Sequence, residues 1–196
     1  MKMVRDTDSD DFNTPIDLVN ACLDQLNHYL PHKDVQLSWL DPCAGDDLRW
    51  ITEIKKNNFG DKCDYTEIKD GLDFFHCRDK YDVIVGNPPF SQLNAWLAHS
   101  VALSQRIVAY ILPAHSLNHK RLAFMESFGF ELVGMHSFPN PKEWGIGFSH
   151  FFCVWKKHYT PEGKAWKDWE NKNNKILQQE ISFQYLLTDF VSQGDE

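Results

Sequence analysis

The stretch from Asp82 to Phe90, DVIVGNPPF, decides the fold class of this chain. Its first half is a near-continuous apolar run, which is typical of a strand buried on both faces of a parallel sheet. Its second half, Asn87–Phe90, follows that strand at the place where open α/β sheets bind ligands. The sequence therefore predicts a parallel sheet with a binding site directly after this strand. The plainer alternative is a Pro-Pro turn that only ends the strand.

Strand and helix patterns alternate on both sides of this stretch. The expected strands are 35–40, 63–68, 81–86, 107–112, 130–135 and 150–155, and the expected helices are 15–30, 48–57, 93–103 and 118–128. We expect Thr14 to cap the first helix, with Pro15 in its first position, and Gly129 to end the last helix. The order predicts an α/β fold with a Rossmann-like, mostly parallel sheet, an antiparallel last strand and flanking helices.

Length and composition predict one principal domain. A chain of 196 residues with 42% hydrophobic residues can bury a proper core without disulfides. We expect this domain to span residues 1–158 and residues 159–196 to form a helical appendage packed on it. The apolar stretches fall short of the roughly 20 residues that a membrane span needs. The five cysteines contain no CxxC pair, which suits a reducing compartment. These features predict a soluble, cytoplasmic protein.

The motif Asn87–Phe90 has the chemistry of a site for a flat, aminated substrate. The side-chain oxygen of Asn87 and the carbonyl of Pro88 can both accept hydrogen bonds from an exocyclic NH2 group. Pro88 and Pro89 hold these acceptors rigid, and Phe90 offers an aromatic face on which a base can stack.

A second motif, DPCAGDD at residues 41–47, reads as a turn of small residues between a strand and a helix. At such a turn the backbone can approach a cofactor closely. An acid after the following strand would accept both hydroxyls of a ribose, and Glu67 is the candidate, with Asp64 as the alternative. Asp73 could accept from an adenine amino group, and Phe74 could cover its ring. Each acid alone is more often a solvated surface group, but the ordered set favours a nucleoside site.

Taken together, these motifs resemble the amino-group methyltransferases of the class I, S-adenosylmethionine-dependent family. The likeness is greatest to the adenine-N6 DNA methyltransferases, which carry [N/D]-P-P-[Y/F], and it covers roughly residues 12–155. It extends to the segment FNTP, residues 12–15, which is similar to the Phe-x-Thr-Pro segment of that family. The short length, without a target-recognition domain, looks most like small phage-type enzymes.

The resemblance implies S-adenosylmethionine as cofactor and transfer of its methyl group to the N6 amine of adenine in DNA. The implied cofactor-binding residues are Phe12, Thr14, Pro15, Asp41, Pro42, Cys43, Ala44, Gly45, Glu67, Asp73 and Phe74, and the implied catalytic residues are Asn87, Pro88, Pro89 and Phe90. Among these, Asp41 is expected near the methionine ammonium and Gly45 near the methionine backbone. One departure is Asp47, which stands where the family usually has a second glycine and is expected to crowd the cofactor.

Several alternatives stay open. The same motif would serve RNA adenine, cytosine or a protein glutamine, and a cofactor-binding but catalytically weak partner protein belongs to a different class. The net charge of −8 argues against coating nucleic acid by bulk electrostatics, so any contact with DNA or RNA must be local. The loop 138–148, with Lys142 and several aromatic residues, could reach a nucleic-acid strand or could be an ordinary connection.

His115 and His119 have the spacing of a helical metal pair, but no third ligand is near them in sequence, so we expect no metal site. The oligomeric state is left open.

Overall fold

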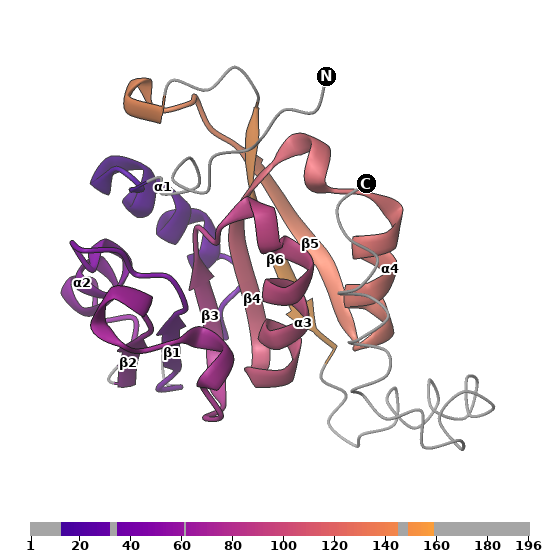
Figure 1. Ribbon diagram of the computed structural model, residues 1–196, viewed down its shortest axis with the longest axis horizontal. Coiled ribbons are helices and arrows are strands. Elements are labelled where there is room, and N and C mark those ends of the chain that lie inside the picture. The colour runs from indigo at the N-terminus through magenta and orange to yellow at the C-terminus, as the bar shows by residue number, and fades with distance from the viewer. Residues whose placement is uncertain (1–12, 32–34, 61, 145–148, 159–196) are drawn as a thin grey trace.

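The fold is a six-stranded sheet with helices on both faces. The computed structural model describes residues 13–31, 35–60, 62–144 and 149–158. The strands are β1 (Ser38–Asp41), β2 (Lys62–Tyr65), β3 (Tyr81–Gly86), β4 (Ser104–Pro113), β5 (Phe130–Ser137) and β6 (His150–Lys157), in the spatial order β2-β1-β3-β4-β6-β5. Strand β6 is antiparallel to both of its neighbours, whereas the pairs among β1 to β4 are parallel (Figure 1). The predicted fold class, with an antiparallel last strand, is confirmed.

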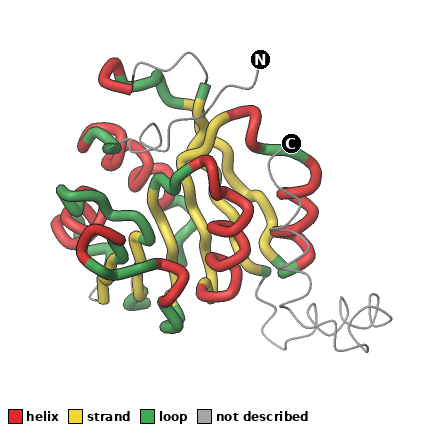
Figure 2. Tube along the Cα trace, viewed as in Figure 1, coloured by secondary structure: helices red, strands yellow, loops and turns green. Residues whose placement is uncertain are grey.

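Alternating residues of the central strands face two separate cores. Trp39 and Val83 belong to one core, beneath the helices α1 (Ile16–Asn27) and α2 (Arg49–Lys56). Their neighbours Leu40 and Ile84 belong to the other core, beneath α3 (Leu93–Leu103) and α4 (His119–Ser127). Since successive side chains of a strand point to opposite faces, apolar residues at every position are what a sheet covered on both sides requires (Figure 2).

Short 3-10 turns follow several strands. They are Ile68–Asp70, Phe74–His76, Phe90–Gln92, Ala114–Ser116 and Lys142–Trp144. Most of them occupy the connections at the carboxyl ends of the parallel strands, where the sequence predicts the site.

Several predicted boundaries shift. Strand β1 begins only at Ser38 and β2 ends at Tyr65, so both are shorter than expected. Strand β4 is longer and starts at Ser104, because it pairs with both β3 and β6. The predicted helix 93–103 and strand 81–86 are confirmed residue for residue.

The helix ends confirm one expectation and correct another. Gly129 lies at φ +79° after α4, and its amide donates to the carbonyl of Glu126, as expected of a residue that ends a helix. The expected cap at Thr14 is wrong, because Pro15 occupies the N-cap position of α1 without a side-chain hydrogen bond. The Thr14 carbonyl instead accepts a hydrogen bond from Arg49.

The two histidines with helical metal-pair spacing do not share a helix. His115 lies in the 3-10 turn Ala114–Ser116, whereas His119 is the first residue of α4. In the part of the chain that the structure describes, no group of three or more His, Cys, Asp or Glu side chains could hold a metal ion.

Two predictions fall on residues that the structure does not describe. The appendage at 159–196 and Phe12 both lie outside the described ranges. Within those ranges, no helix is both long enough and apolar enough to cross a membrane.

Candidate functional site

A cleft of about 520 Å³ opens at the carboxyl edge of β1, β2 and β3. Parallel strands end at the same edge of a sheet, so the connections that follow these strands meet there. The predicted site residues that line the cleft are Thr14, Pro42, Cys43, Ala44, Gly45, Glu67, Asp73, Phe74, Asn87 and Pro89. The fold thus brings residues from four distant parts of the chain to one space.

Four predicted residues do not line this cleft, namely Pro15, Asp41, Pro88 and Phe90. Pro15 is the N-cap residue of α1, and Pro88 is buried. Asp41 and Phe90 have surroundings of their own, described below.

Gly45 and Glu67 form the middle of the cleft wall. Gly45 lies at φ +64°, and a Cβ built on it would be 2.9 Å from Oδ1 of Asn13. The Gly45 amide donates to Oε2 of Glu67 at 3.0 Å, and the Lys69 amide donates to Oε1 at 3.1 Å. Backbone amides therefore orient the Glu67 carboxylate, while the absence of a side chain at position 45 lets the segment at Asn13 approach.

Asp41 lies fully buried behind the wall formed by 42–45. Its Oδ1 accepts from the Cys43 amide at 3.1 Å, and its Oδ2 has no hydrogen-bond partner among the described residues. The pKa of Asp41 is raised to about 7, chiefly by burial; the hydrogen bond from the Cys43 amide opposes the rise, and the nearby charge of Glu67 adds to it. A Cβ on Gly86 would lie 2.9 Å from Asp41 Oδ1, so a glycine at that position leaves room for the carboxyl group.

Cys43 lines the cleft but is not a nucleophile. Burial raises the pKa of its thiol well above the ordinary value, and the negative charge of Asp41 adds to the effect. A protonated thiol in this position acts as a small packing group.

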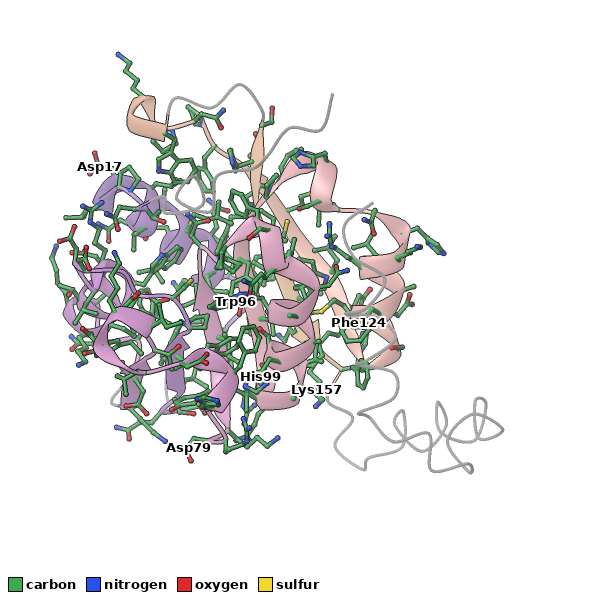
Figure 3. The ribbon with its side chains drawn as sticks, in the orientation of Figure 1. Asp17, Asp79, Trp96, His99, Phe124 and Lys157 are labelled. Carbon is green, nitrogen blue, oxygen red and sulfur yellow. The ribbon has the colours of Figure 1, made fainter. Side chains whose placement is uncertain are left out.

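An aromatic cluster forms the far end of the cleft. Phe74 stacks on Trp96 with ring centroids 4.6 Å apart and an angle of 18°, and Phe75 meets Trp96 edge-on at 5.6 Å. His99, on the same helix as Trp96 (Figure 3), meets the Phe74 ring at 4.7 Å. Asp73 accepts from the Phe75 amide at 2.9 Å. Flat apolar walls beside a fixed carboxylate suit a planar, aminated ring.

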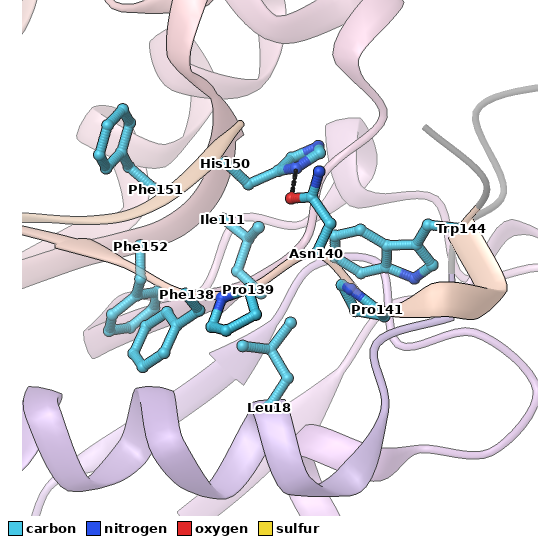
Figure 4. Close-up of a pocket in the computed structure, with 10 residues that line it drawn as sticks. All are labelled: Leu18, Ile111, Phe138, Pro139, Asn140, Pro141, Trp144, His150, Phe151 and Phe152. Carbon is cyan, nitrogen blue, oxygen red and sulfur yellow. Dashed lines mark hydrogen bonds between the residues drawn. The ribbon is translucent and has the colours of Figure 1, made fainter. Parts of the chain in front are cut away.

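Phe90 contacts the first residue of β6. Its ring lies 5.8 Å from that of His150, which is buried and makes a hydrogen bond of 3.0 Å through Nδ1 to Oδ1 of Asn140 (Figure 4). The Trp144 ring meets His150 edge-on at 5.1 Å, and Trp144 Nε1 donates to the Asn13 carbonyl at 3.0 Å. Through these contacts the loop between β5 and β6 joins the region of Phe90 to the Asn13 segment.

The described part of the loop 138–148 agrees in part with the alternative that it is an ordinary connection between two strands. Phe138 and Trp144 pack against the core, whereas Lys142 is exposed. The cavity drawn in Figure 4 measures about 10 Å³, room for a water molecule and too little for a substrate. Residues 145–148 lie outside the described ranges.

The two remaining acids of the sequence analysis lie away from the cleft. Asp47 is half-exposed, does not line the cleft and pairs with Arg49 at 2.5 Å. Asp47 therefore does not occupy the cleft, where the expected crowding would arise. Asp64, the alternative to Glu67, accepts instead from the hydroxyl of Tyr81 at 2.9 Å.

The sequence analysis missed nine lining residues as site candidates. They are Asn13, Arg49, Trp50, Ile68, Lys69, Leu72, Phe75, Gln92 and Trp96. One signal was available, because Gln92 and Trp96 lie four residues apart on the turn and helix that follow Phe90, and this spacing places them on one helical face. Arg49 carried no comparable signal.

Comparisons with known proteins give a consistent fold. No protein-family model matches the chain, and neither does any curated protein sequence. Among solved structures, the magnesium protoporphyrin IX methyltransferase of Synechocystis with bound S-adenosylmethionine is similar with a TM-score of 0.51 and 11% identity, covering 81% of this chain and 86% of that one. The precorrin-6y C5,15-methyltransferase of Geobacter metallireducens is similar with a TM-score of 0.53 and 13% identity, covering 76% of this chain and 91% of that one. The 1,6-didemethyltoxoflavin-N1-methyltransferase of Burkholderia thailandensis is similar with a TM-score of 0.51 and 11% identity, covering 72% of this chain and 78% of that one. At these identities the likeness establishes the fold, which is the Rossmann-like methyltransferase fold.

Proposed function

We propose that this protein transfers a methyl group from S-adenosylmethionine to the exocyclic N6 amine of adenine in DNA. One observation carries the proposal. A single cleft of about 520 Å³ combines a nucleoside-type wall, with Glu67 and Asp73, and the amine-accepting residue Asn87. The methyltransferase fold supports the same reaction class, since similar structures include enzymes with bound S-adenosylmethionine and S-adenosylhomocysteine.

The residues of the cleft fit this cofactor. Glu67, oriented by backbone amides, suits the two ribose hydroxyls, and the Asp73 carboxylate beside the Phe74 ring suits the adenine. Gly45 exposes backbone where a side chain would fill the space. Behind this wall lies the buried Oδ2 of Asp41, and a positive charge near this oxygen would stabilise the ionised carboxylate. The cofactor carries two such charges, an ammonium and a sulfonium. When bound, the cofactor supplies an electrophilic methyl group on its sulfonium.

Alignment of the amine with that methyl group is the main task of the protein. We assign to Asn87 and to the Pro88 carbonyl the acceptance of the two amine hydrogens. These acceptors favour a tetrahedral nitrogen whose lone pair points at the methyl group, and they stabilise the positive charge that develops on it. No strong general base is required. In duplex DNA the adenine must leave the stack, and Phe90 offers a face that replaces the lost stacking.

Asp47 bears on the alternative of a catalytically weak partner protein. That alternative depended in part on a carboxylate in the cofactor space, and Asp47 lies outside the cleft in a pair with Arg49. RNA adenine, cytosine and protein glutamine use the same acceptors, so the choice among substrates is made by experiment.

The test is transfer of labelled methyl from S-adenosylmethionine to duplex DNA, single-stranded DNA and RNA, with the products digested to nucleosides. We expect label in N6-methyladenine from DNA, lost in Asn87→Ala and kept in Asn20→Ala, an asparagine of α1 that does not line the cleft. Label found in RNA or in protein, and not in DNA, would show that DNA is not the substrate. Absence of label on every polymer by a protein that binds the cofactor would refute the proposed reaction.

A further inference from the structure

We propose that Arg49 binds the α-carboxylate of the cofactor and that Asp47 holds the Arg49 side chain in place for it. This inference rests on the proposed function, because it assigns one end of the same cleft. It concerns residues to which neither the motifs nor the resemblance gave a role in binding.

Hydrogen bonds and close contacts order the cleft wall from one end to the other. Leu72 pairs with Glu67 through a β-bridge, and the Gly45 amide donates to Glu67. Gly45 in turn approaches Asn13, and the next residue, Thr14, accepts a hydrogen bond from Arg49. The aromatic cluster that holds Phe74 and Trp96 follows Leu72 at the opposite end. A cofactor with its adenine at this cluster and its ribose at Glu67 extends its methionine arm over Gly45 toward Arg49.

Charge selects Arg49 as the partner of the carboxylate. That group is the only anion of S-adenosylmethionine, and among the described residues that line the cleft the Lys and Arg side chains are Arg49 and Lys69. The Lys69 amide donates to Glu67 at the ribose end, and the Lys69 Nζ is already paired with the Asp46 carboxylate at 3.4 Å. Arg49 is the cation at the methionine end.

The guanidinium of Arg49 is positioned by two acceptors. Its Nη1 donates to the Thr14 carbonyl at 3.0 Å, and its Nη2 donates to Oδ2 of Asp47 at 2.5 Å. The side chain is 28% exposed, and the guanidinium carries more N–H donors than these two contacts use. A planar, bidentate donor held in this way matches a carboxylate. Asp47, at the position where a second glycine was expected, thus orients the binding group.

The test compares two ligands by calorimetry, without any turnover. S-adenosylmethionine and its decarboxylated analogue differ only in the carboxylate. Arg49→Met is expected to weaken binding of S-adenosylmethionine by about 10-fold to 100-fold, and binding of the decarboxylated analogue by much less. Arg49→Lys is expected to recover part of the loss. Asp47→Asn is expected to weaken S-adenosylmethionine binding by about 2-fold to 5-fold, because an exposed ion pair contributes little.

Two further variants control the comparison. Lys56→Gln removes a positive charge from the exposed end of α2, outside the cleft, and is expected to leave both affinities unchanged. Lys69→Met tests the other cation, and a carboxylate-dependent loss there in place of Arg49 would overturn the assignment.

Equal losses of both ligands in Arg49→Met would show that Arg49 acts only through the Thr14 segment, and would overturn the inference while leaving the proposed function standing. Tighter binding in Asp47→Gly would overturn the role of Asp47. A wild-type protein that binds neither ligand would refute the proposed cofactor, and this assignment with it.

Discussion

Asp41→Asn tests whether ionisation of the carboxyl group behind the cleft wall lowers the stability of the folded protein. The pKa of Asp41 rises from 3.8 to about 7, first because of burial and then because of the nearby charge of Glu67. Each unit corresponds to about 1.4 kcal/mol, so the ionised carboxyl destabilises the ligand-free folded state by about 4 kcal/mol above pH 7. The unfolded chain releases this proton near the ordinary value, so the folded state binds more protons between these two pKa values. The free energy of unfolding therefore falls as the pH rises through this window.

The substitution removes the ionisation and keeps the contact that orients the group. An asparagine oxygen can still accept from the Cys43 amide. The new NH2 group stands where Asp41 Oδ2 has no hydrogen-bond partner among the described residues, and this costs about 1–3 kcal/mol at every pH. The pH-dependent part is separate from that constant cost. Between about pH 5 and pH 8, the stability of Asp41→Asn relative to wild type is expected to rise by about 2–3 kcal/mol.

Urea unfolding at several pH values in this range, without ligand, measures the difference directly. Asp24→Asn, which removes an exposed carboxylate from α1, is the matched control and is expected to follow the wild type. Parallel stability curves for wild type and Asp41→Asn across the range would refute the reasoning, since they would show that the folded state does not hold this proton. A rise of similar size in Asp24→Asn would assign the effect to net charge.

Three further predictions concern Gly45, Trp144 and His150. Gly45→Ala places a Cβ at φ +64°, 2.9 Å from Asn13 Oδ1, and is expected to lower the free energy of unfolding by about 1–2 kcal/mol and to weaken binding of S-adenosylmethionine. Unchanged affinity by calorimetry would contradict it. Trp144→Phe keeps an aromatic ring but removes the donor to the Asn13 carbonyl, so a loss of about 1 kcal/mol in urea unfolding is expected, and an unaltered midpoint would show that this bond contributes nothing. Burial, together with the charge of His115, lowers the pKa of His150, so the unfolded chain binds that proton more readily and stability falls as the pH drops below the ordinary histidine value. His150→Phe is expected to lose less stability than wild type on going from pH 7 to about pH 5, and an equal loss would argue against a neutral, buried His150.

Local patterns predicted the strand and helix elements well. The apolar run 81–86 indicated a strand buried on both faces, and Gly129 could adopt the left-handed conformation that ends α4. Motif residues at the ends of β1 and β3 were expected at one edge because parallel strands end there, and Gly45 and Asn87 do line one cleft. These features depend on a few neighbouring residues, so they can be read along the chain.

Side-chain directions in the connections could not be predicted in the same way. Asp47 pairs with Arg49 and does not line the cleft, and the Thr14 carbonyl accepts a hydrogen bond from Arg49 where a helix cap was expected. These contacts join residues that lie far apart in the sequence or in a loop. Each contributes only a small free energy, so the packing of the whole fold decides which contact forms.

The sequence by itself determined the alternation of strands and helices, the turn of small residues and the amine-accepting motif, because each depends on local backbone preference and on apolar periodicity. Only the tertiary structure decided that Asp41 lies behind the cleft wall, that Phe90 meets His150, and that Arg49 stands at one end of the cleft. The physical reason is that burial and side-chain partners are properties of the whole packed sheet, which no short stretch of the chain contains.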